Sequence, residues 1–204
     1  MSGKQLKVEG VNNPKTSHGM MKMNTIVEAA VELFVKEGFY QTSISDICKK
    51  AKTAVGTFYI YFDSKADIYK YLMAKYKSEI KQNLASSIAG CTTRREKEKE
   101  GIKSFIRYVV KTPNVYNIIW GSLSIDHKMF SDYYESFAKS YIRALTGEGE
   151  EVRASDYSTV AYMLMGISNF LGLKAMFENM SDDQIEDMIE HSVMPCLENG
   201  VFLK

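Results

Sequence analysis

The sequence contains few of the residues that build disulfide frameworks or metal sites. Its 204 residues include only three cysteines, at positions 48, 91 and 196, and no two of them form a CxxC pair. The three histidines, at positions 18, 127 and 191, are equally far apart. This spacing indicates neither disulfide bonds nor a zinc site, so we expect no metal and no cofactor.

Prolines, strand patterns and long apolar stretches are also scarce. Only three prolines interrupt the chain, and Pro113 and Pro195 lie in otherwise helical patterns. No run of residues alternates in the way that a β-strand requires, which favours an all-α fold. Because no segment of about eighteen uncharged apolar residues, no signal sequence and no internal repeat is present, we expect a cytoplasmic protein without membrane contact.

Charge is distributed unevenly along the chain. The formal net charge is only +1, but residues 1–75 carry eleven lysines and seven acidic residues, a surplus of four positive charges. Residues 76–204 carry fifteen basic and eighteen acidic residues, a surplus of three negative charges. A modestly basic first part is what non-specific affinity for a polyanion such as DNA requires.

Residues 26–72 contain helix patterns separated by tight turns. The first helix has apolar residues at the spacing of one helical face, namely Ile26, Ala29, Ala30, Leu33 and Phe34. It ends at Gly38, which can take the left-handed conformation that a helix end needs. Ser43 and Asp46 then have the spacing of a capping box, and Thr53 precedes a third helix over residues 54–61. Two helices joined by so short a turn indicate a helix-turn-helix.

Helical patterns continue to the end of the chain. A fourth helix begins at Lys65 and carries apolar residues at every fourth position as far as Ile88. A charged linker after residue 90 leads into a fifth helix, which ends before Pro113, and a short sixth helix follows. The remaining patterns predict helices over residues 128–145, over residues 156–178 and from residue 181 onward.

The ordered series from Ile26 to about Leu72 resembles the DNA-binding domain of the TetR-like (tetracycline-repressor) family of bacterial transcriptional regulators. The matching segments are AAVELFVKEGFYQTSISDICKKA, GTFYIYF at residues 56–62 and the DSKADIY that follows. Beyond residue 90 the resemblance is one of helix order alone. It implies an all-α fold of about nine helices, with an N-terminal three-helix helix-turn-helix domain and a larger C-terminal helical domain for ligand binding and dimerisation.

On this basis we divide the chain into three parts. They are a disordered arm over residues 1–21, a helix-turn-helix DNA-binding domain over residues 22–68, and a ligand-binding and dimerisation domain over residues 69–204. The resemblance also assigns phosphate contacts with double-stranded DNA to Thr42 or Ser43, Tyr59, Tyr61 and Lys65. Base contacts fall on Thr53, Ala54, Val55 and Thr57, with close approach allowed at Gly56. The expected core residues are Ile47, Ala51, Phe58 and Phe62.

The sequence departs from the family pattern at two of these positions. Lys52 stands where a glycine is common, so the turn is either less strained or uses the lysine as an extra phosphate anchor. Val55 stands where a lysine or another polar residue is frequent. This change removes a cationic contact and offers methyl groups suited to thymine. The operator sequence therefore cannot be transferred from the family.

Aromatic residues are concentrated between residues 105 and 141. Flat rings with polar edges can form a concave and mostly apolar pocket, which is the usual composition of a small-molecule site. The candidate ligand-binding residues are Phe105, Tyr108, Tyr116, Trp120, Phe130, Tyr134, Phe137, Tyr141, Met163 and Phe170. They predict a small hydrophobic or aromatic effector. The alternative is that an aromatic stripe at helical spacing is ordinary core.

The last two predicted helices resemble the dimerisation pair of the family, which forms a four-helix bundle across a two-fold axis. The helix over residues 156–178 is apolar around most of its circumference, so we expect burial on more than one side. A monomer would expose the second face to water, which favours a homodimer. The candidate dimerisation residues are Leu164, Ile167, Leu171, Ala175, Ile185, Met188, Ile189, Ser192 and Cys196.

These patterns predict a ligand-responsive transcriptional regulator that binds a near-palindromic operator as a homodimer. Repression that a ligand relieves is the default outcome in the family. One alternative is a regulator of the same fold that acts through protein partners without a small-molecule effector. Another is an enzyme that uses the aromatic cavity. The sequence has no paired nucleophile and base, no HExxH motif and no glycine-rich phosphate loop, so we expect no enzymatic activity.

Overall fold

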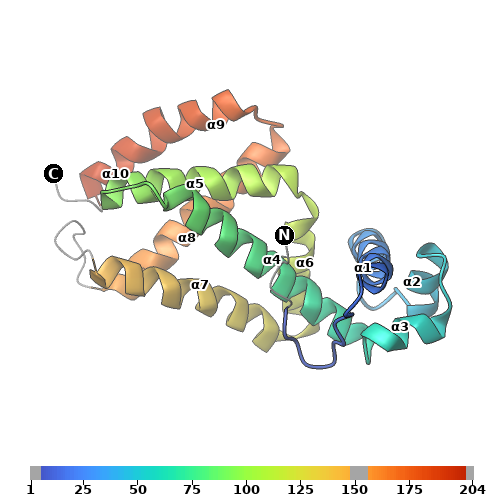
Figure 1. Cartoon of the computed structure of the whole chain (residues 1–204). Coiled ribbons are helices and arrows are strands. Elements are labelled where there is room, and N and C mark those ends of the chain that lie inside the picture. The colour runs from blue at the N-terminus through green and yellow to red at the C-terminus, as the bar shows by residue number, and fades with distance from the viewer. Residues whose placement is uncertain (1–5, 148–155, 201–204) are drawn as a thin grey trace. The chain divides into compact units, whose positions relative to one another are not determined.

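The structure is a computed structural model that describes residues 6–147 and 156–200. The described residues form helices joined by short segments, with one isolated β-bridge (Figure 1). The helices are α1 (Ser17–Glu37), α2 (Ile44–Lys50), α3 (Val55–Tyr61), α4 (Lys65–Ile88), α5 (Arg94–Lys111), α6 (Asn114–Ile125), α7 (His127–Gly147), α8 (Tyr157–Phe177), α9 (Asp182–Met188), the π-helix η1 (Ile189–Val193) and α10 (Met194–Gly200). If the continuous segment from α9 to α10 is counted as one helix, the described residues hold nine helices, and the predicted all-α fold is confirmed.

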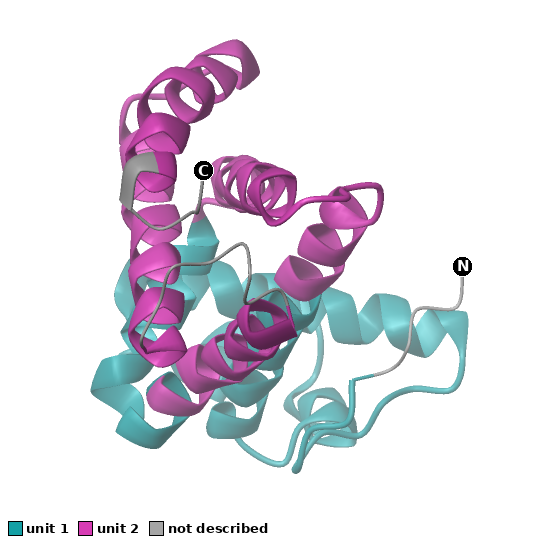
Figure 2. Cartoon of the chain, turned by 90° about the vertical axis from the view of Figure 1, so that its left-hand side faces the viewer, with its two compact units in different colours: residues 1–78, 114–130 teal, residues 79–113, 131–204 magenta. Residues whose placement is uncertain are grey.

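The chain folds into two compact units, which Figure 2 shows in different colours. Unit 1 comprises residues 1–78 and 114–130, and unit 2 comprises residues 79–113 and 131–204. The chain crosses between the units inside α4, between α5 and α6, and inside α7, so α4 and α7 each run from one unit into the other without a break. The predicted division into functional domains at residue 68 stays a prediction.

Helix α6 belongs to unit 1, although the sequence analysis assigned it to the second domain. It packs against α1. The hydroxyl of the buried Tyr69 on α4 donates to the carbonyl of Ile118 on α6 at 2.6 Å. Sequence periodicity shows that a helix is amphipathic, but it does not show which neighbour its apolar face meets.

Aromatic rings form much of the core of unit 1. The ring of Phe34 on α1 lies 5.3 Å from that of Tyr69, and the rings of Phe58 and Phe62 are 5.5 Å apart. The side chains of Phe58 and Phe62 are fully buried, and the predicted core positions Ile47 and Ala51 are buried as well. Because these rings anchor one side of α3 in the core, the opposite side of this helix faces outward.

The segment before α1 differs from the predicted disordered arm. Residues 17–21 form the first turns of α1, where the Thr16 side chain accepts a hydrogen bond from the N–H of Gly19. Before that, the N–H of Asn12 donates to the carbonyl of Tyr61 at 2.8 Å, and the carbonyl of Gly10 accepts from the N–H of Asp63 at 3.0 Å. The arm was predicted from its glycines, asparagines and proline. Its backbone instead pairs with the turn that follows α3. Residues 1–5 of the predicted arm lie outside the described residues.

Unit 2 is built around α5, which packs against α8 and α9. Its core contains Ile102, Ile106, Leu145, Ala161, Leu164, Ala175, Ile185 and Ile189, all buried. The buried residues of α5 recur at helical spacing, which places one face of this helix against α8 and α9.

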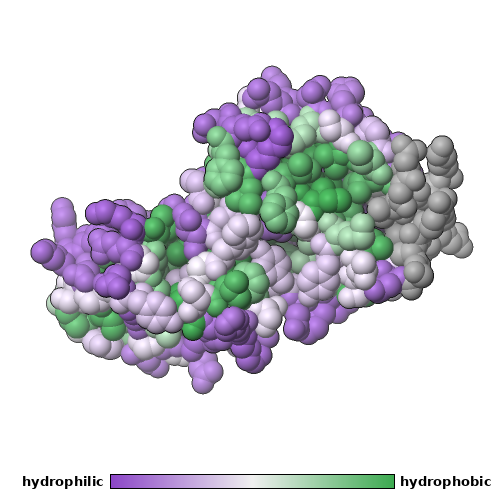
Figure 3. Space-filling model, turned by 180° about the vertical axis from the view of Figure 1, so that it is seen from behind, coloured by the Kyte–Doolittle hydropathy of each residue, from purple (hydrophilic) through white to green (hydrophobic). Residues whose placement is uncertain are grey.

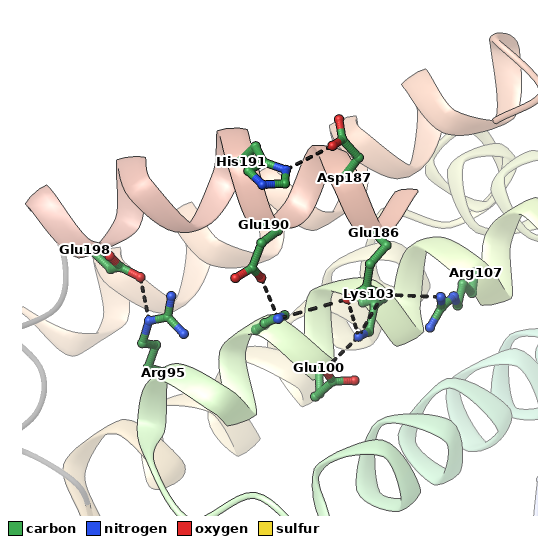
Figure 4. A network of polar contacts seen from close by, with 10 residues as sticks. Arg95, Glu100, Lys103, Arg107, Glu186, Asp187, Glu190, His191 and Glu198 are labelled. Atoms are coloured by element: carbon green, nitrogen blue, oxygen red, sulfur yellow. Dashed lines mark hydrogen bonds and ion pairs between the residues drawn. The ribbon is translucent and has the colours of Figure 1, made fainter. Parts of the chain in front are cut away.

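A row of ion pairs joins α5 to the last helical segment (Figure 4). On α5 the cations recur at every fourth residue and meet acids from α9 to α10: Arg95 pairs with Glu198, Lys99 with Glu190, Lys103 with Glu186, and Arg107 with Asp182. Burial alone would lower the pKa of Lys103, but its hydrogen bonds to Glu100 and Glu186 outweigh burial and raise the pKa above its usual value. The network fixes which face of the last segment meets α5.

Candidate DNA-binding face and ligand pocket

Local hydrogen bonds hold both the start of α2 and the short turn between α2 and α3. At the start of α2, the Ser43 hydroxyl accepts from the N–H of Asp46, and the Asp46 carboxylate accepts from the N–H of Ser43, both at 3.1 Å. The Asp46 carboxylate also accepts from the Ser43 hydroxyl, and this bond, followed by the bond from the Ser43 N–H, holds the pKa of the Asp46 carboxyl below its usual value. At the other end, the N–H of Thr53 donates to the carbonyl of Cys48 at 3.0 Å. The predicted capping box and tight turn are therefore both present.

One side of α3 faces solvent. Val55 and Tyr59 are 45% and 49% exposed, and Ala54 and Gly56 are exposed as well. Among the described residues, and apart from its chain neighbours and the backbone of its own helix, no heavy atom lies within 4 Å of the place where a Cβ on Gly56 would stand. An exposed helix face that follows a tight turn can enter the major groove of a duplex. Of the predicted base-contacting residues, only Thr53 and Thr57 are partly buried.

Ile60 was missed by the sequence analysis. Its side chain is 61% exposed, on the same helix as Val55 and Tyr59. An isoleucine is assigned to the core by default. Its position four residues after Gly56 could have placed it on the outward face, because residues four apart share a face of a helix.

Two predicted phosphate contacts are buried in unit 1. Thr42 is 1% exposed and its hydroxyl donates to the carbonyl of Gly38 at 2.8 Å. Of the alternatives Thr42 and Ser43, only the exposed Ser43 therefore remains a candidate. Tyr61 is 6% exposed, contrary to the predicted surface hydroxyl. It lies three residues after Phe58, so it shares the inward face of α3.

Lys65 also has internal partners. Its Nζ donates to the carbonyls of Phe39 and Thr42, each at 2.6 Å, and lies 4.4 Å from the centroid of the Phe39 ring. Burial lowers the pKa of the Lys65 ammonium. The ammonium therefore joins the start of α4 to the segment between α1 and α2. Of Tyr59, Tyr61 and Lys65, the exposed Tyr59 is the remaining candidate for a phosphate contact.

Lys52 adopts a backbone conformation that favours glycine. Its φ is 52°, in the left-handed region, so the predicted less strained turn is wrong, and the alternative of an extra phosphate anchor stays a prediction. We expect Lys52→Gly to raise the free energy of unfolding by about 1 kcal/mol, because glycine takes this conformation without a Cβ clash. Urea denaturation checks this value. An unchanged or lower stability would show that the lysine side chain stabilises the turn through its own contacts.

Unit 2 contains a pocket of about 350 Å³ formed by α4, α5, α7 and α8. Its wall is mainly apolar and aromatic and includes Ile80, Leu84, Ile88, Tyr133 and Met165. Four of the predicted ligand-binding residues line it, namely Phe105, Tyr134, Phe137 and Tyr141. The volume lies in the range of small-molecule sites.

The other predicted ligand-binding residues do not line this pocket: Tyr108, Tyr116, Trp120, Phe130, Met163 and Phe170. The Tyr108 hydroxyl donates to Glu79 at 2.7 Å. Unit 1 contains Tyr116, Trp120 and Phe130. Met163 and Phe170 are 53% and 69% exposed. Because α8 is apolar on several faces, periodicity does not separate a pocket face of this helix from an outer face.

A buried polar cluster adjoins the pocket. Arg94 and Tyr141 line the pocket. The Arg94 guanidinium forms an ion pair with the carboxylate of Glu98, and the Tyr141 hydroxyl donates a hydrogen bond to the same carboxylate. Arg94 and Glu98 are 5% and 1% exposed. Burial, followed by the charge of Glu98, raises the pKa of Tyr141 well above its usual value. This hydroxyl therefore remains a hydrogen-bond donor at neutral pH. The sequence analysis treated the charged stretch after residue 90 as a linker into the fifth helix and missed this cluster.

Helix α8 has an exposed apolar stripe. Met163, Phe170 and Phe177 are separated by seven residues each, so they lie on one side of the helix, and Phe177 is 73% exposed. Figure 3 shows hydrophobic residues gathered on a face of unit 2. Within the described residues, α8 alone is long and apolar enough to cross a bilayer by length and composition, a test that helices of soluble proteins also pass. Exposed apolar surfaces of this kind are typical of interaction sites.

The predicted dimerisation residues lie mostly inside unit 2. Leu164, Ala175, Ile185 and Ile189 are fully buried in its core, and Ile167, Leu171 and Met188 are partly buried against that core. Ser192 and Cys196 are exposed. Helix α8 is apolar on two faces, and the α8 residues that the sequence analysis chose lie on its inward face. The exposed stripe of Met163, Phe170 and Phe177 is the outward one.

Comparison with known proteins agrees with this geometry. Residues 26–72 match the family described as bacterial regulatory proteins, tetR family. The chain is 24% identical over 192 residues to the fatty acid metabolism regulator protein of Bacillus subtilis (strain 168), covering 90% of this chain and 97% of that protein. It is 52% identical over 52 residues to the uncharacterized HTH-type transcriptional regulator YvdT of the same organism, 26% of each chain.

Solved structures share the fold. The transcriptional regulator FadR from Bacillus subtilis, determined in complex with stearoyl-CoA, matches with a TM-score of 0.71 at 22% identity, covering 87% of this chain and 98% of that chain. The family match lies over the helix-turn-helix, and the match to the fatty acid metabolism regulator protein extends over 90% of the chain. Residues 26–72 therefore belong to the tetR family of bacterial regulatory proteins, and the chain as a whole shares the fold of a solved transcriptional regulator.

Proposed function

We propose that this protein is a cytoplasmic transcriptional repressor that binds a near-palindromic operator as a homodimer and leaves it when a hydrophobic effector binds. The observation that carries the proposal is the exposed face of α3, with Val55, Gly56 and Tyr59 uncovered beside a tight turn. This face suits base contacts in a major groove, and the Tyr59 hydroxyl suits a backbone phosphate. Two such faces, related by a two-fold axis, require a palindromic site.

Gly56 offers a test of this face in which stability and binding change in opposite directions. We expect Gly56→Ala to raise the free energy of unfolding by about 0.5 to 1 kcal/mol, because alanine favours helix more than glycine does and the space around it is open. The same methyl group should weaken duplex binding about tenfold where the backbone approaches DNA closely. Thermal unfolding and fluorescence anisotropy with labelled operator measure the two effects. Unchanged DNA affinity in this stabilised variant would remove α3 from the interface.

The homodimer is proposed to form through the exposed stripe of α8. Aromatic residues at the centre of an interface contribute most to its affinity. We expect Phe170→Arg to raise the dimer Kd at least about a hundredfold, because a charged group would then be buried in the interface. Analytical ultracentrifugation measures the change. Met21→Arg is the matched control, because Met21 is 68% exposed on α1 and should leave dimerisation unchanged. A dimer that survives Phe170→Arg would place the interface elsewhere.

The effector is proposed to occupy the aromatic pocket of unit 2. The apolar wall supports a hydrophobic ligand, and the similarity to a fatty acid metabolism regulator supports an acyl group. Helix α4 lines the pocket and also continues into unit 1, so one continuous helix connects the pocket with the unit that carries α3. An effector that prefers the non-binding conformation by about 3 kcal/mol would lower operator affinity on the order of a hundredfold.

Duplex binding with and without stearoyl-CoA tests the switch, since this compound was bound in the related FadR structure. The DNA is the fragment that flanks the protein's own gene. Release of DNA by the acyl-CoA supports the proposed repressor. Specific DNA binding that no acyl compound changes would favour the alternative of a regulator that acts through protein partners.

A further inference from the structure

Residues 10–12, which we call the junction segment, lie against the chain between α3 and α4. The middle residue, Val11, forms an antiparallel β-bridge with Phe62. Phe62 directly follows α3, and its side chain is fully buried. Both parts of the bridge belong to unit 1, although they lie far apart in the sequence. The junction segment therefore joins the chain before α1 to the end of the helix that carries the proposed DNA-binding face.

The junction segment satisfies backbone groups at the end of α3. The last carbonyls of a helix have no hydrogen-bond partner within the helix. The carbonyl of Tyr61, the last residue of α3, accepts a hydrogen bond from the N–H of Asn12 at 2.8 Å. Two residues further on, the N–H of Asp63 donates to the carbonyl of Gly10 at 3.0 Å. Two hydrogen bonds from outside the aromatic core thus hold the end of α3.

Gly10 fits its place because it has no side chain. Its φ is 72°, in the left-handed region, and a Cβ on it would stand 2.7 and 2.8 Å from the two oxygens of the Asp67 carboxylate on α4. These oxygens are held in place, since one accepts from the Ser64 hydroxyl at 2.6 Å and the other from Nζ of Lys70 at 2.9 Å. Any larger residue at position 10 would therefore push the junction segment away from α4.

The attachment is local, and α3 depends on contacts of this kind. Asn12 is exposed and Gly10 and Val11 are only partly buried, so the junction segment adds little to the core of unit 1. Segments with few buried apolar contacts can open without unfolding the rest of the protein. A helix as short as α3, with seven residues, takes its position from tertiary contacts. Release of the segment would therefore free the end of α3 while the core stays folded.

Resting on the DNA-binding face proposed above, we propose that the junction segment positions α3 for operator binding. The exposed Tyr59 and Ile60 lie in the last turn of α3, directly before the carbonyl that Asn12 holds. A shift of this turn would displace both side chains from the groove. Docking of the segment and binding of DNA are then coupled, and this coupling is reciprocal. The factor by which docking raises DNA affinity is also the factor by which DNA favours docking.

Two substitutions in the full chain release the junction segment. Gly10→Ala should weaken binding to the DNA that flanks the protein's own gene about tenfold and accelerate hydrogen exchange of the Asp63 amide at least about tenfold. Asn12→Pro removes the donor to the Tyr61 carbonyl and should cause both changes as well. Gly90→Ala is the matched control, because apart from its chain neighbours no described heavy atom lies within 4 Å of the added Cβ. It should change neither quantity.

Further readouts separate positioning from loss of folding and from direct contact with DNA. Binding is measured well below the unfolding temperature of each variant, which circular dichroism gives. The salt dependence of binding should keep its slope in Gly10→Ala, and the exposed Lys7 should be replaceable by glutamine without effect. A slope lower by about one in Lys7→Gln would show a direct phosphate contact in place of positioning. In the wild-type protein, DNA should slow exchange of the Asp63 amide by at least the factor that Gly10→Ala costs in affinity.

Failure of this inference is distinguishable from failure of the proposed function. If Gly10→Ala and Asn12→Pro bind DNA as tightly as Gly90→Ala, the positioning role is wrong and the DNA-binding regulator stands. Weaker binding that only matches a loss of folded protein would overturn the positioning role as well. Exchange of the Asp63 amide that DNA leaves unchanged would contradict the coupling. If the wild-type protein binds no duplex at low salt, the proposed function fails, and the inference fails with it.

Discussion

Glu98→Ala should lower the free energy of unfolding of unit 2 by about 3 to 5 kcal/mol. Glu98 is 1% exposed and is bonded by both Arg94 and the Tyr141 hydroxyl. Removing its carboxylate leaves the guanidinium of Arg94, itself 5% exposed, buried without this counter-charge. A buried charge that loses its partner costs far more than the pair contributes when intact. Urea denaturation, followed by circular dichroism, measures the loss.

A double replacement separates the charge effect from loss of packing. Arg94→Met combined with Glu98→Leu exchanges the pair for apolar side chains, and we expect it to recover most of the lost stability, as is usual for buried pairs. Glu96→Ala is the control on the same helix, because the Glu96 carboxylate bonds to exposed backbone N–H groups of Thr92 and Thr93. Its effect should be much smaller. A Glu98→Ala variant as stable as the Glu96→Ala variant would contradict the buried charge cluster.

Lys65→Ala should destabilise unit 1 by about 3 kcal/mol, because it removes two charge-assisted hydrogen bonds and leaves two carbonyls to find new partners. These are the bonds from Nζ to the carbonyls of Phe39 and Thr42. Denaturant unfolding measures the effect. Lys70→Ala is the matched control, because Lys70 lies on the same helix and pairs with Asp67 while 42% exposed. It should cost no more than about 1 kcal/mol.

The result decides how a loss of DNA binding by Lys65→Ala is to be read. If Lys65 stabilises the fold, this variant loses affinity for every duplex through unfolding, and the phosphate contact must be tested at Tyr59 instead. Tyr59→Phe removes only an exposed hydroxyl and should weaken binding to all sequences alike. Should Lys65→Ala be as stable as Lys70→Ala, the ammonium would be available to phosphate, as the family resemblance implies.

The sequence allowed the helix-turn-helix to be predicted in detail, because its signals are local. A capping box at Ser43 and Asp46, a turn after α2 and a ring pair at Phe58 and Phe62 each involve residues a few positions apart. The arm was predicted to run to residue 21, whereas α1 begins at Ser17. The first turns of this helix are largely exposed and carry no apolar stripe, so only the cap at Thr16 marks them.

The pocket and the outer face of α8 depend on tertiary packing and were predicted only in part. Phe137 and Tyr141 were correctly placed in the pocket wall, whereas Phe170 was placed in the pocket but lies on the surface. A helix that is apolar around most of its circumference gives no signal of which side meets the core. The burial of Arg94 and Glu98 was not predicted, because charged residues are rarely buried and are therefore assigned to the surface.

Selection of bound sequences from a random duplex library tests the central claim most directly. An outward α3 presented twice by a homodimer should enrich two related half-sites in inverted orientation, with centres separated by about one DNA turn or a multiple of it. The Gly56→Ala protein should enrich them less efficiently. Recovery of no common sequence at low salt, or of single unpaired half-sites, would contradict the account.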